Sequence, residues 1–136
     1  MAEGGCRCGA VRYRIDGNDG EAEHHALCHY GDCRASAGAP AVAWMAVKED
    51  RFTLLQGDPA TFEGSPGALR QFCPTCGTGL FYRNAEVLPG IVDVQSATLD
   101  NAADYPPAAQ IQCAERLPWM TALSALPEFE RYPAGM

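Results

Sequence analysis

The chain has 136 residues, of which ten are basic and seventeen acidic, so its formal net charge is -7. Lysine and arginine form no cluster along the sequence, which excludes the basic surface that nucleic-acid binding requires. This length predicts a single domain over residues 1–136 that buries one hydrophobic core.

The first predicted element is a half-buried strand over residues 9–16, GAVRYRID. Val11, Tyr13 and Ile15 alternate with two arginines, so the apolar side chains share one face. Turn residues bound the other short apolar segments, and we expect strands at residues 39–47, 51–57, 68–72, 79–84, 90–99 and 108–116. Gly57 is expected to end the strand at residues 51–57.

Helical signals are few. Residues 31–38 could form one turn after Cys33, and residues 121–131 a short terminal helix that Pro127 interrupts. The fold class expected from these patterns is mainly β, with little helix.

The cysteines are the most informative residue type. Their interpretation depends on the compartment of the protein. The N-terminal stretch has no apolar signal-peptide core, and the longest apolar run is shorter than the ~18 residues that span a membrane. We therefore expect a cytoplasmic protein with no membrane partner. Cytosolic thiols stay reduced, and the count of seven cysteines is odd. Metal binding is therefore preferred over disulfides.

The strongest local motif is FCPTCGTGL, where Cys73 and Cys76 lie on a tight Cys-x-x-Cys-Gly turn. Pro74 stiffens this turn, and Gly77 can adopt the positive φ that points backbone N–H groups at sulfur. The motif predicts half of a structural zinc site. The rival interpretation is a thioredoxin-like redox pair, which would begin a helix in a βαβ unit rather than lie between strands.

Cys6 and Cys8, flanked by glycines, are the candidates for the other half of the zinc site. The 64 residues from position 9 to position 72 separate the two pairs, so spacing alone leaves the grouping open, and two half-buried thiols are the alternative. Closing this loop costs roughly 4 kcal/mol. That cost is below the ~10–16 kcal/mol of structural zinc binding.

Five motifs together resemble, in order and spacing, the glutathione-dependent formaldehyde-activating enzyme family, which includes centromere protein V. They extend from Gly4 to about Pro133 and read GGCRCGAVRY, CHYGDCRASAGAP, RQFCPTCGTGLFY, ATLDN and LPW. The resemblance implies an Mss4-like fold of small coiled antiparallel sheets around a structural zinc. It also implies that Cys6, Cys8, Cys73 and Cys76 are the four ligands of that ion.

The family also carries a three-cysteine zinc site in a CHCxxC motif, whose open position is associated with carbon–sulfur lyase chemistry on S-hydroxymethylglutathione. Here CHYGDC retains Cys28 and Cys33 as candidate catalytic and metal-binding residues, but Tyr30 replaces the middle thiolate. A phenol keeps its proton at neutral pH and is a harder donor than a thiolate. The second zinc site is therefore expected to be incomplete.

Other side chains are candidates to complete this second site. They are His29, Cys113, Asp32, His24 and His25. For each of them we expect a role other than metal binding. Cys113 suits a buried position in the strand at 108–116, and a histidine in a strand is more often exposed or hydrogen-bonded than bound to a metal. The family's late His-Ile pair is replaced by Gln110 and Ile111.

Two hypotheses about function follow, and a third concerns redox chemistry. The first is a zinc-binding, lyase-like protein that acts on adducts of glutathione, or another small thiol, with small aldehydes; Arg34, Arg70 and Arg83 are candidates to anchor the ligand's carboxylate. The second is a non-catalytic single-zinc β domain that binds a small thiol or a protein partner. The third is a reversible disulfide between Cys28 and Cys33.

Overall fold

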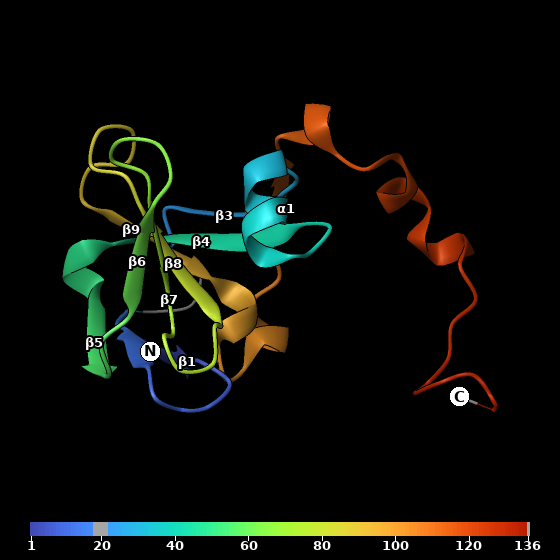
Figure 1. Ribbon diagram of the computed structural model, residues 1–136, viewed down its shortest axis with the longest axis horizontal. Helices are drawn as coiled ribbons and strands as arrows, with labels where there is room; N and C mark the ends of the chain where they lie inside the picture. Colours follow the sequence, from blue (N-terminus) through green and yellow to red (C-terminus); the bar gives the residue numbers. More distant parts are fainter. Residues whose placement is uncertain (18–21, 136) are drawn as a thin grey trace.

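A computed structural model describes residues 1–17 and 22–135, and it is mainly β, as the sequence predicts. The strands of the described residues form two sheets (Figure 1). The smaller sheet has the order β1-β2-β5, with bounds Ala2–Gly5, Arg12–Ile15 and Phe52–Gln56. The larger has the order β10-β3-β4-β9-β8-β7-β6, with bounds Ala109–Ile111, His24–Cys28, Val42–Lys48, Ile91–Gln95, Gly79–Arg83, Leu69–Phe72 and Ala60–Glu63.

Both sheets are antiparallel except at one edge of the larger sheet. There β10 runs parallel to β3, with Ile111 opposite Cys28. The expectation of wholly antiparallel sheets is thus wrong at this edge, because a long excursion through β4 to β9 brings the chain back in the same direction. This pairing places the residues after β10 beside the end of β3.

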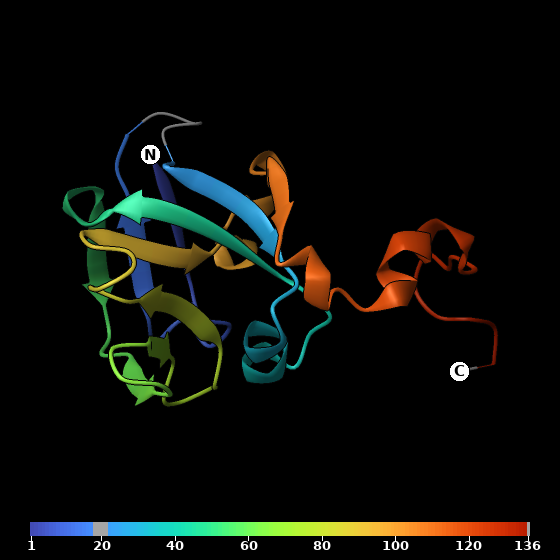
Figure 2. The same cartoon turned by 90° about the horizontal axis from the view of Figure 1, so that it is seen from above.

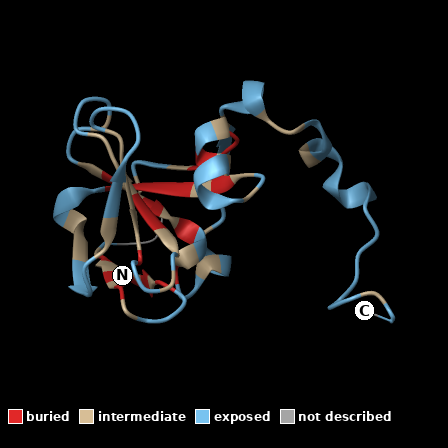
Figure 3. Cartoon of the chain, viewed as in Figure 1, coloured by how far each residue is buried: buried red, intermediate tan, exposed pale blue. Residues whose placement is uncertain are grey.

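The core lies between the two sheets (Figure 3). Tyr13 of β2 is fully buried and meets the Phe81 ring of β8 edge-on, with 5.2 Å between ring centroids. Phe52 of β5 meets the same ring at 4.9 Å. The alternation predicted for residues 9–16 is confirmed, since Val11, Tyr13 and Ile15 are all buried.

The only α-helix of the described residues is α1, Gly31–Ala37. The helix expected within residues 31–38 is thus present, although it begins at Gly31 rather than after Cys33, and Cys33 is its buried residue. Gly38 ends the helix in the left-handed conformation, with φ at 63°, and its N–H donates to the Arg34 carbonyl. Helix α1 therefore fixes Cys33 against β4, where Val42 and Trp44 are buried.

Short 3-10 helices occupy several positions where strand or α-helix was expected. Their bounds are Glu49–Arg51, Ser96–Thr98, Ala102–Asp104, Cys113–Glu115 and Pro118–Ala125. The strand predicted to reach residue 99 thus ends at Gln95, and the strand predicted to reach residue 116 ends at Ile111. Gln112 has a positive φ of 54°, which a continuing strand cannot accommodate.

Residues 118–135 form an arm that extends away from the two sheets (Figures 1 and 2). The helix expected over residues 121–131 is instead the 3-10 helix Pro118–Ala125, and no described residue of the arm is buried. Trp119, Phe129 and Tyr132 are each more than half exposed. Among the described residues, no helix has the length and apolar content to cross a membrane.

One acidic side chain lies within the larger sheet. Asp93 of β9 is opposite Ala46 on one side and Tyr82 on the other. Burial raises the pKa of its carboxyl to about 6, against an opposing effect of His24. Because this value exceeds that of an unfolded aspartate, the folded state binds the proton more tightly, and the stability gained below about pH 4 is lost as the pH rises through 6.

We predict that Asp93→Asn raises the free energy of unfolding at pH 7.5 by about 1–3 kcal/mol, because it removes a partly desolvated charge. The gain should shrink as the pH falls from 7.5 to 5. Denaturant unfolding of the two proteins at both pH values measures this. Glu86→Gln, at an exposed position, is the matched control, and a less stable Asp93→Asn protein at pH 7.5 would contradict the assignment.

Candidate metal centre and adjoining thiol pair

The first two cysteines of the candidate metal centre lie on the turn between β1 and β2. The Cys6 N–H donates to the Val11 carbonyl at 3.0 Å, and the Gly9 N–H donates to the Cys6 carbonyl at 3.1 Å. Gly9 has a φ of 83°, which a side chain would strain. These bonds curl the backbone so that Cys6 and Cys8 lie on one side of the turn.

The other two cysteines lie on the turn between β7 and β8. The Gly77 N–H donates to the Cys73 carbonyl at 2.8 Å, and the Cys73 N–H donates to the Thr78 carbonyl at 2.9 Å. Gly77 has a φ of 79°, so the predicted positive φ is confirmed. Because the pair joins two antiparallel strands, it lacks the helix start of a thioredoxin-like motif.

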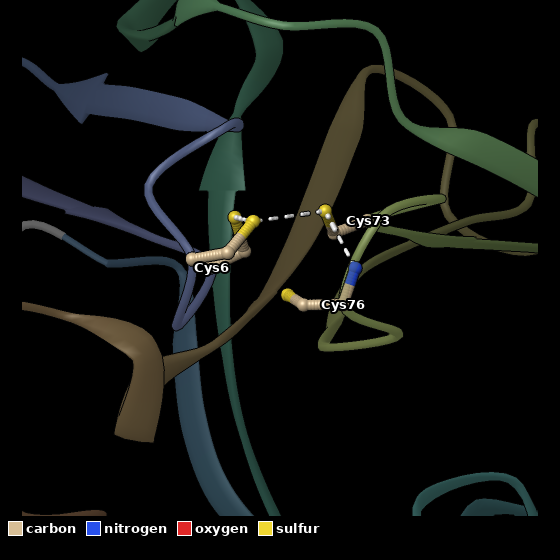
Figure 4. Close-up of side chains that lie close together, drawn as sticks. Cys6, Cys73 and Cys76 are labelled. Atoms are coloured by element: carbon tan, nitrogen blue, oxygen red, sulfur yellow. Dashed lines mark hydrogen bonds between the residues drawn. The ribbon is translucent and has the colours of Figure 1, made fainter.

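The two turns bring four sulfur atoms together, which is the cysteine cluster Cys6, Cys8, Cys73 and Cys76 (Figure 4). All four sulfurs lie within 4.8 Å of one another; Cys6 and Cys8 are 3.5 Å apart, and Cys8 and Cys73 are 3.8 Å apart. Four thiolates at ~2.3 Å from a tetrahedral zinc ion would lie about 3.8 Å apart. The cysteine cluster therefore fits such an ion.

Backbone donors stabilise negative charge on these sulfurs. The Val11 N–H donates to Cys6 Sγ at 3.2 Å, and the Cys76 N–H donates to Cys73 Sγ at 3.4 Å. The hydroxyl and then the N–H of Thr78 lower the pKa of the Cys76 thiol to about 5. Such N–H···S contacts are the outer-shell partners that metal-bound thiolates use.

Cys28 and Cys33 form a separate thiol pair. Cys28 ends β3 and Cys33 lies on α1; both are buried, and their sulfurs are 3.8 Å apart. Burial, together with the neighbouring Cys33, raises the pKa of the Cys28 thiol to about 11. In residues 1–17 and 22–135, the cysteine cluster is the only group of three or more His, Cys, Asp or Glu side chains close enough to share an ion. No third ligand of these types therefore joins the thiol pair.

The histidines proposed to complete this site are occupied or distant. His29 is fully buried, and its Nε2 donates to Gln110 Oε1 at 2.8 Å, while Nδ1 has no hydrogen-bond partner. His25 Nε2 lies 2.8 Å from Ser96 Oγ, and burial lowers the pKa of its imidazole. His24 is exposed at the start of β3, the end remote from Cys28.

The remaining candidates do not complete the site either. Cys113 was expected in a buried strand position, and this is wrong, because it is exposed on a 3-10 helix that follows the left-handed Gln112. Asp32 lies on α1 but pairs with Arg70. Tyr30 precedes α1 and is 40% exposed, so its side chain leaves the protein interior instead of taking a ligand position.

Arg70 of β7 is a charged side chain in contact with the thiol pair. Its Nη2 lies 3.5 Å from Cys33 Sγ and 2.8 Å from a carboxylate oxygen of Asp32, and its guanidinium lies over the Tyr82 ring. The side chain is only 16% exposed. Arg70 therefore places a cationic N–H donor against Cys33 Sγ.

Arg70 also lines a cavity of about 600 Å³ between α1 and the larger sheet. Apolar walls come from Trp44, Phe72 and Phe81, and polar groups come from Ser36 and Gln95. This volume suits a small organic ligand. Sequence reasoning singled out Arg70 but missed Trp44 and Gln95, whose shared face follows from the β4–β9 register rather than from any motif.

The other two arginines proposed as carboxylate anchors have structural partners. Arg34 donates to the carbonyls of His29 and Glu115, which ties α1 to the segment after β10. Arg83 pairs with Glu49 at 2.7 Å and lies over the Phe52 ring. A further cavity, of about 530 Å³, lies at the His25 end of β3 and contains no cysteine.

Comparison with known proteins agrees with this geometry. The model of the glutathione-dependent formaldehyde-activating enzyme family matches residues 1–115, so the chain belongs to that family. No curated protein matches the chain. A solved structure of a Rhodobacter sphaeroides protein has the same fold, with a TM-score of 0.63 and 20% identity over 79% of this chain and 98% of its own.

We predict that Cys73→Ser abolishes tight metal binding, because it removes a fully buried thiolate from a site that needs four. Since structural metal binding contributes ~10–16 kcal/mol, the variant should be largely unfolded at 25 °C. Metal analysis and circular dichroism measure both effects. Cys113→Ser is the control for a thiol outside the cysteine cluster, and a folded Cys73→Ser protein that retains its metal would refute the assignment.

Proposed function

We propose, from the membership of this chain in the glutathione-dependent formaldehyde-activating enzyme family, that it forms or cleaves the carbon–sulfur bond of small thiol–aldehyde adducts. Glutathione is the expected thiol and formaldehyde the simplest aldehyde. The family match supports the class of reaction, and the cavity that Arg70 lines is the proposed location of the reaction. The predicted cytoplasmic location would supply the reduced thiol.

The metal in this proposal is one zinc ion, bound by the cysteine cluster. Four thiolates close the coordination shell, and closed four-cysteine sites are structural. When bound, the ion supplies no open position to a substrate. The reaction is therefore assigned to the cavity between α1 and the larger sheet. The cysteines Cys28 and Cys33 offer only two ligands there, and no step of the proposed reaction uses a second ion.

The observation that carries the proposal is that Arg70 both lines a ligand-sized cavity and contacts Cys33. In adduct formation, the sulfur of the substrate thiol bonds to the aldehyde carbon, the C=O electron pair moves to oxygen, and that oxygen takes a proton. The Arg70 cation stabilises the developing negative charge on oxygen. Cys33, which neighbours Cys28, is assigned to transfer the proton from the substrate thiol to this oxygen.

A specific observation favours a second candidate function. Tyr30 leaves the family's three-thiolate site with two sulfurs, which suits a non-catalytic single-zinc domain. Such a protein would bind the small thiol or a protein partner in the same cavity without converting the adduct. Binding without turnover separates this candidate from the first.

We predict that the protein accelerates exchange between formaldehyde plus glutathione and S-hydroxymethylglutathione, measured by NMR exchange spectroscopy. Arg70→Gln should lower the protein-dependent rate by about 10²-fold, because it removes an electrostatic stabiliser of the reacting oxygen. Arg83→Gln, one strand away, is the matched control and should keep the rate.

The same samples test the metal assignment. We expect one zinc ion per chain in the native protein and in Cys28→Ser. Two tightly bound ions would contradict the single-ion proposal. Exchange no faster than in buffer, with glutathione still perturbing the Trp44 fluorescence, would leave the non-catalytic candidate in its place.

A further inference from the structure

The thiol pair has the geometry of a dithiol that can be oxidised. Its sulfurs are 3.8 Å apart, and a disulfide requires about 2.05 Å. One sulfur comes from the end of a strand and the other from the following helix, and disulfide formation requires side-chain movement that shortens the distance between them. Since no third His, Cys, Asp or Glu of the described residues joins them, no metal ligand set competes for the two thiols.

The two thiols have different surroundings. Cys33 is 8% exposed and lies 3.5 Å from Arg70 Nη2, and Arg70 lines the cavity together with Asp32 and Ser36 of α1. Cys28 is 4% exposed and lies behind it, against Val42 and Ile111. A thiolate beside a cation and a ligand cavity is the attacking sulfur in exchange reactions, and its buried neighbour is the resolving one.

We propose that Cys33 and Cys28 form a thiol–disulfide exchange site for small disulfides of the glutathione type. The Cys33 thiolate attacks one sulfur of the disulfide, a mixed disulfide forms, and the first small thiolate leaves. Cys28 then gives its proton to solvent and attacks the Cys33 sulfur, releasing the second small thiolate. In total the protein dithiol loses two electrons and two protons, and one small disulfide becomes two small thiols.

This reaction differs from the proposed adduct chemistry, although both use Cys33 and Arg70. It consumes no aldehyde, and its acceptor is the disulfide itself. The cavity beside Arg70 serves as the entry for the small disulfide, because its apolar walls and cationic group suit a ligand with carboxylates. A protein that fails to convert thiol–aldehyde adducts can still show exchange, and the reverse also holds.

The test uses the zinc-loaded protein with Cys113→Ser, which removes the exposed thiol outside both clusters. The protein is equilibrated with glutathione and glutathione disulfide at graded ratios, quenched with acid and alkylated, and its thiols are counted by mass. We expect a loss of two thiols, located by peptide mapping at Cys28 and Cys33. The cysteine cluster should stay fully reduced.

Trapping then identifies the attacking sulfur. In the same background, Cys28→Ser should accumulate one glutathionyl group on Cys33, while Cys33→Ser should accumulate one on Cys28 at least about tenfold more slowly. Arg70→Gln should slow trapping on Cys33 by about tenfold, because it removes the neighbouring cation. Arg83→Gln is the control for loss of an arginine elsewhere on the sheet.

Some outcomes would overturn the inference. They are an unchanged thiol count at every ratio, loss of thiols from the cysteine cluster alone, and equal trapping by Cys28→Ser and Cys33→Ser. Every variant is checked for one zinc ion and a native circular dichroism spectrum. Where a cysteine variant fails this check, the alkylation rates of the two thiols in the parent protein identify the attacking sulfur. Cys33 should react faster than Cys28, and the reverse order would overturn the inference.

Discussion

The fold depends on the contact between two turns that are distant in the sequence. The turn between β1 and β2 belongs to the smaller sheet, and the turn between β7 and β8 belongs to the larger one. The cysteine cluster joins them, so a metal ion there ties one sheet to the other across a long loop. The core between the sheets, centred on Tyr13 and Phe81, depends on the same alignment.

The register of the larger sheet then separates structure from chemistry. On β4, Met45 and Val47 point into the core, whereas Trp44 lies on the opposite face with Cys28 and Tyr82. Because alternate residues of a strand point to opposite faces, one sheet carries a closed core on one side and a helix-covered cavity on the other. Residues can therefore change on the cavity face while the core face stays packed.

The sequence predicted local features better than long-range ones. The Cys73–Cys76 turn and the strand at Val11–Ile15 follow from spacing and alternation, which are properties of a few neighbouring residues. Strands β1, β3 and β6 were missed; AEGG of β1 and ATFE of β6 carry no alternation of apolar residues. The placement of Arg70 beside Cys33 could not be predicted at all, since it depends on how α1 packs against strands far along the chain.

The replacement at Tyr30 costs the fold little, for a reason visible in the packing. The Tyr30 side chain is 40% exposed, its fully buried neighbour is His29, and Gln110 Oε1 accepts a hydrogen bond from His29 Nε2. A thiolate at position 30 would have contributed to a metal shell, but its absence leaves no hole in the described core. Stability therefore rests on the cysteine cluster and the sheet-to-sheet contacts rather than on the side chain at position 30.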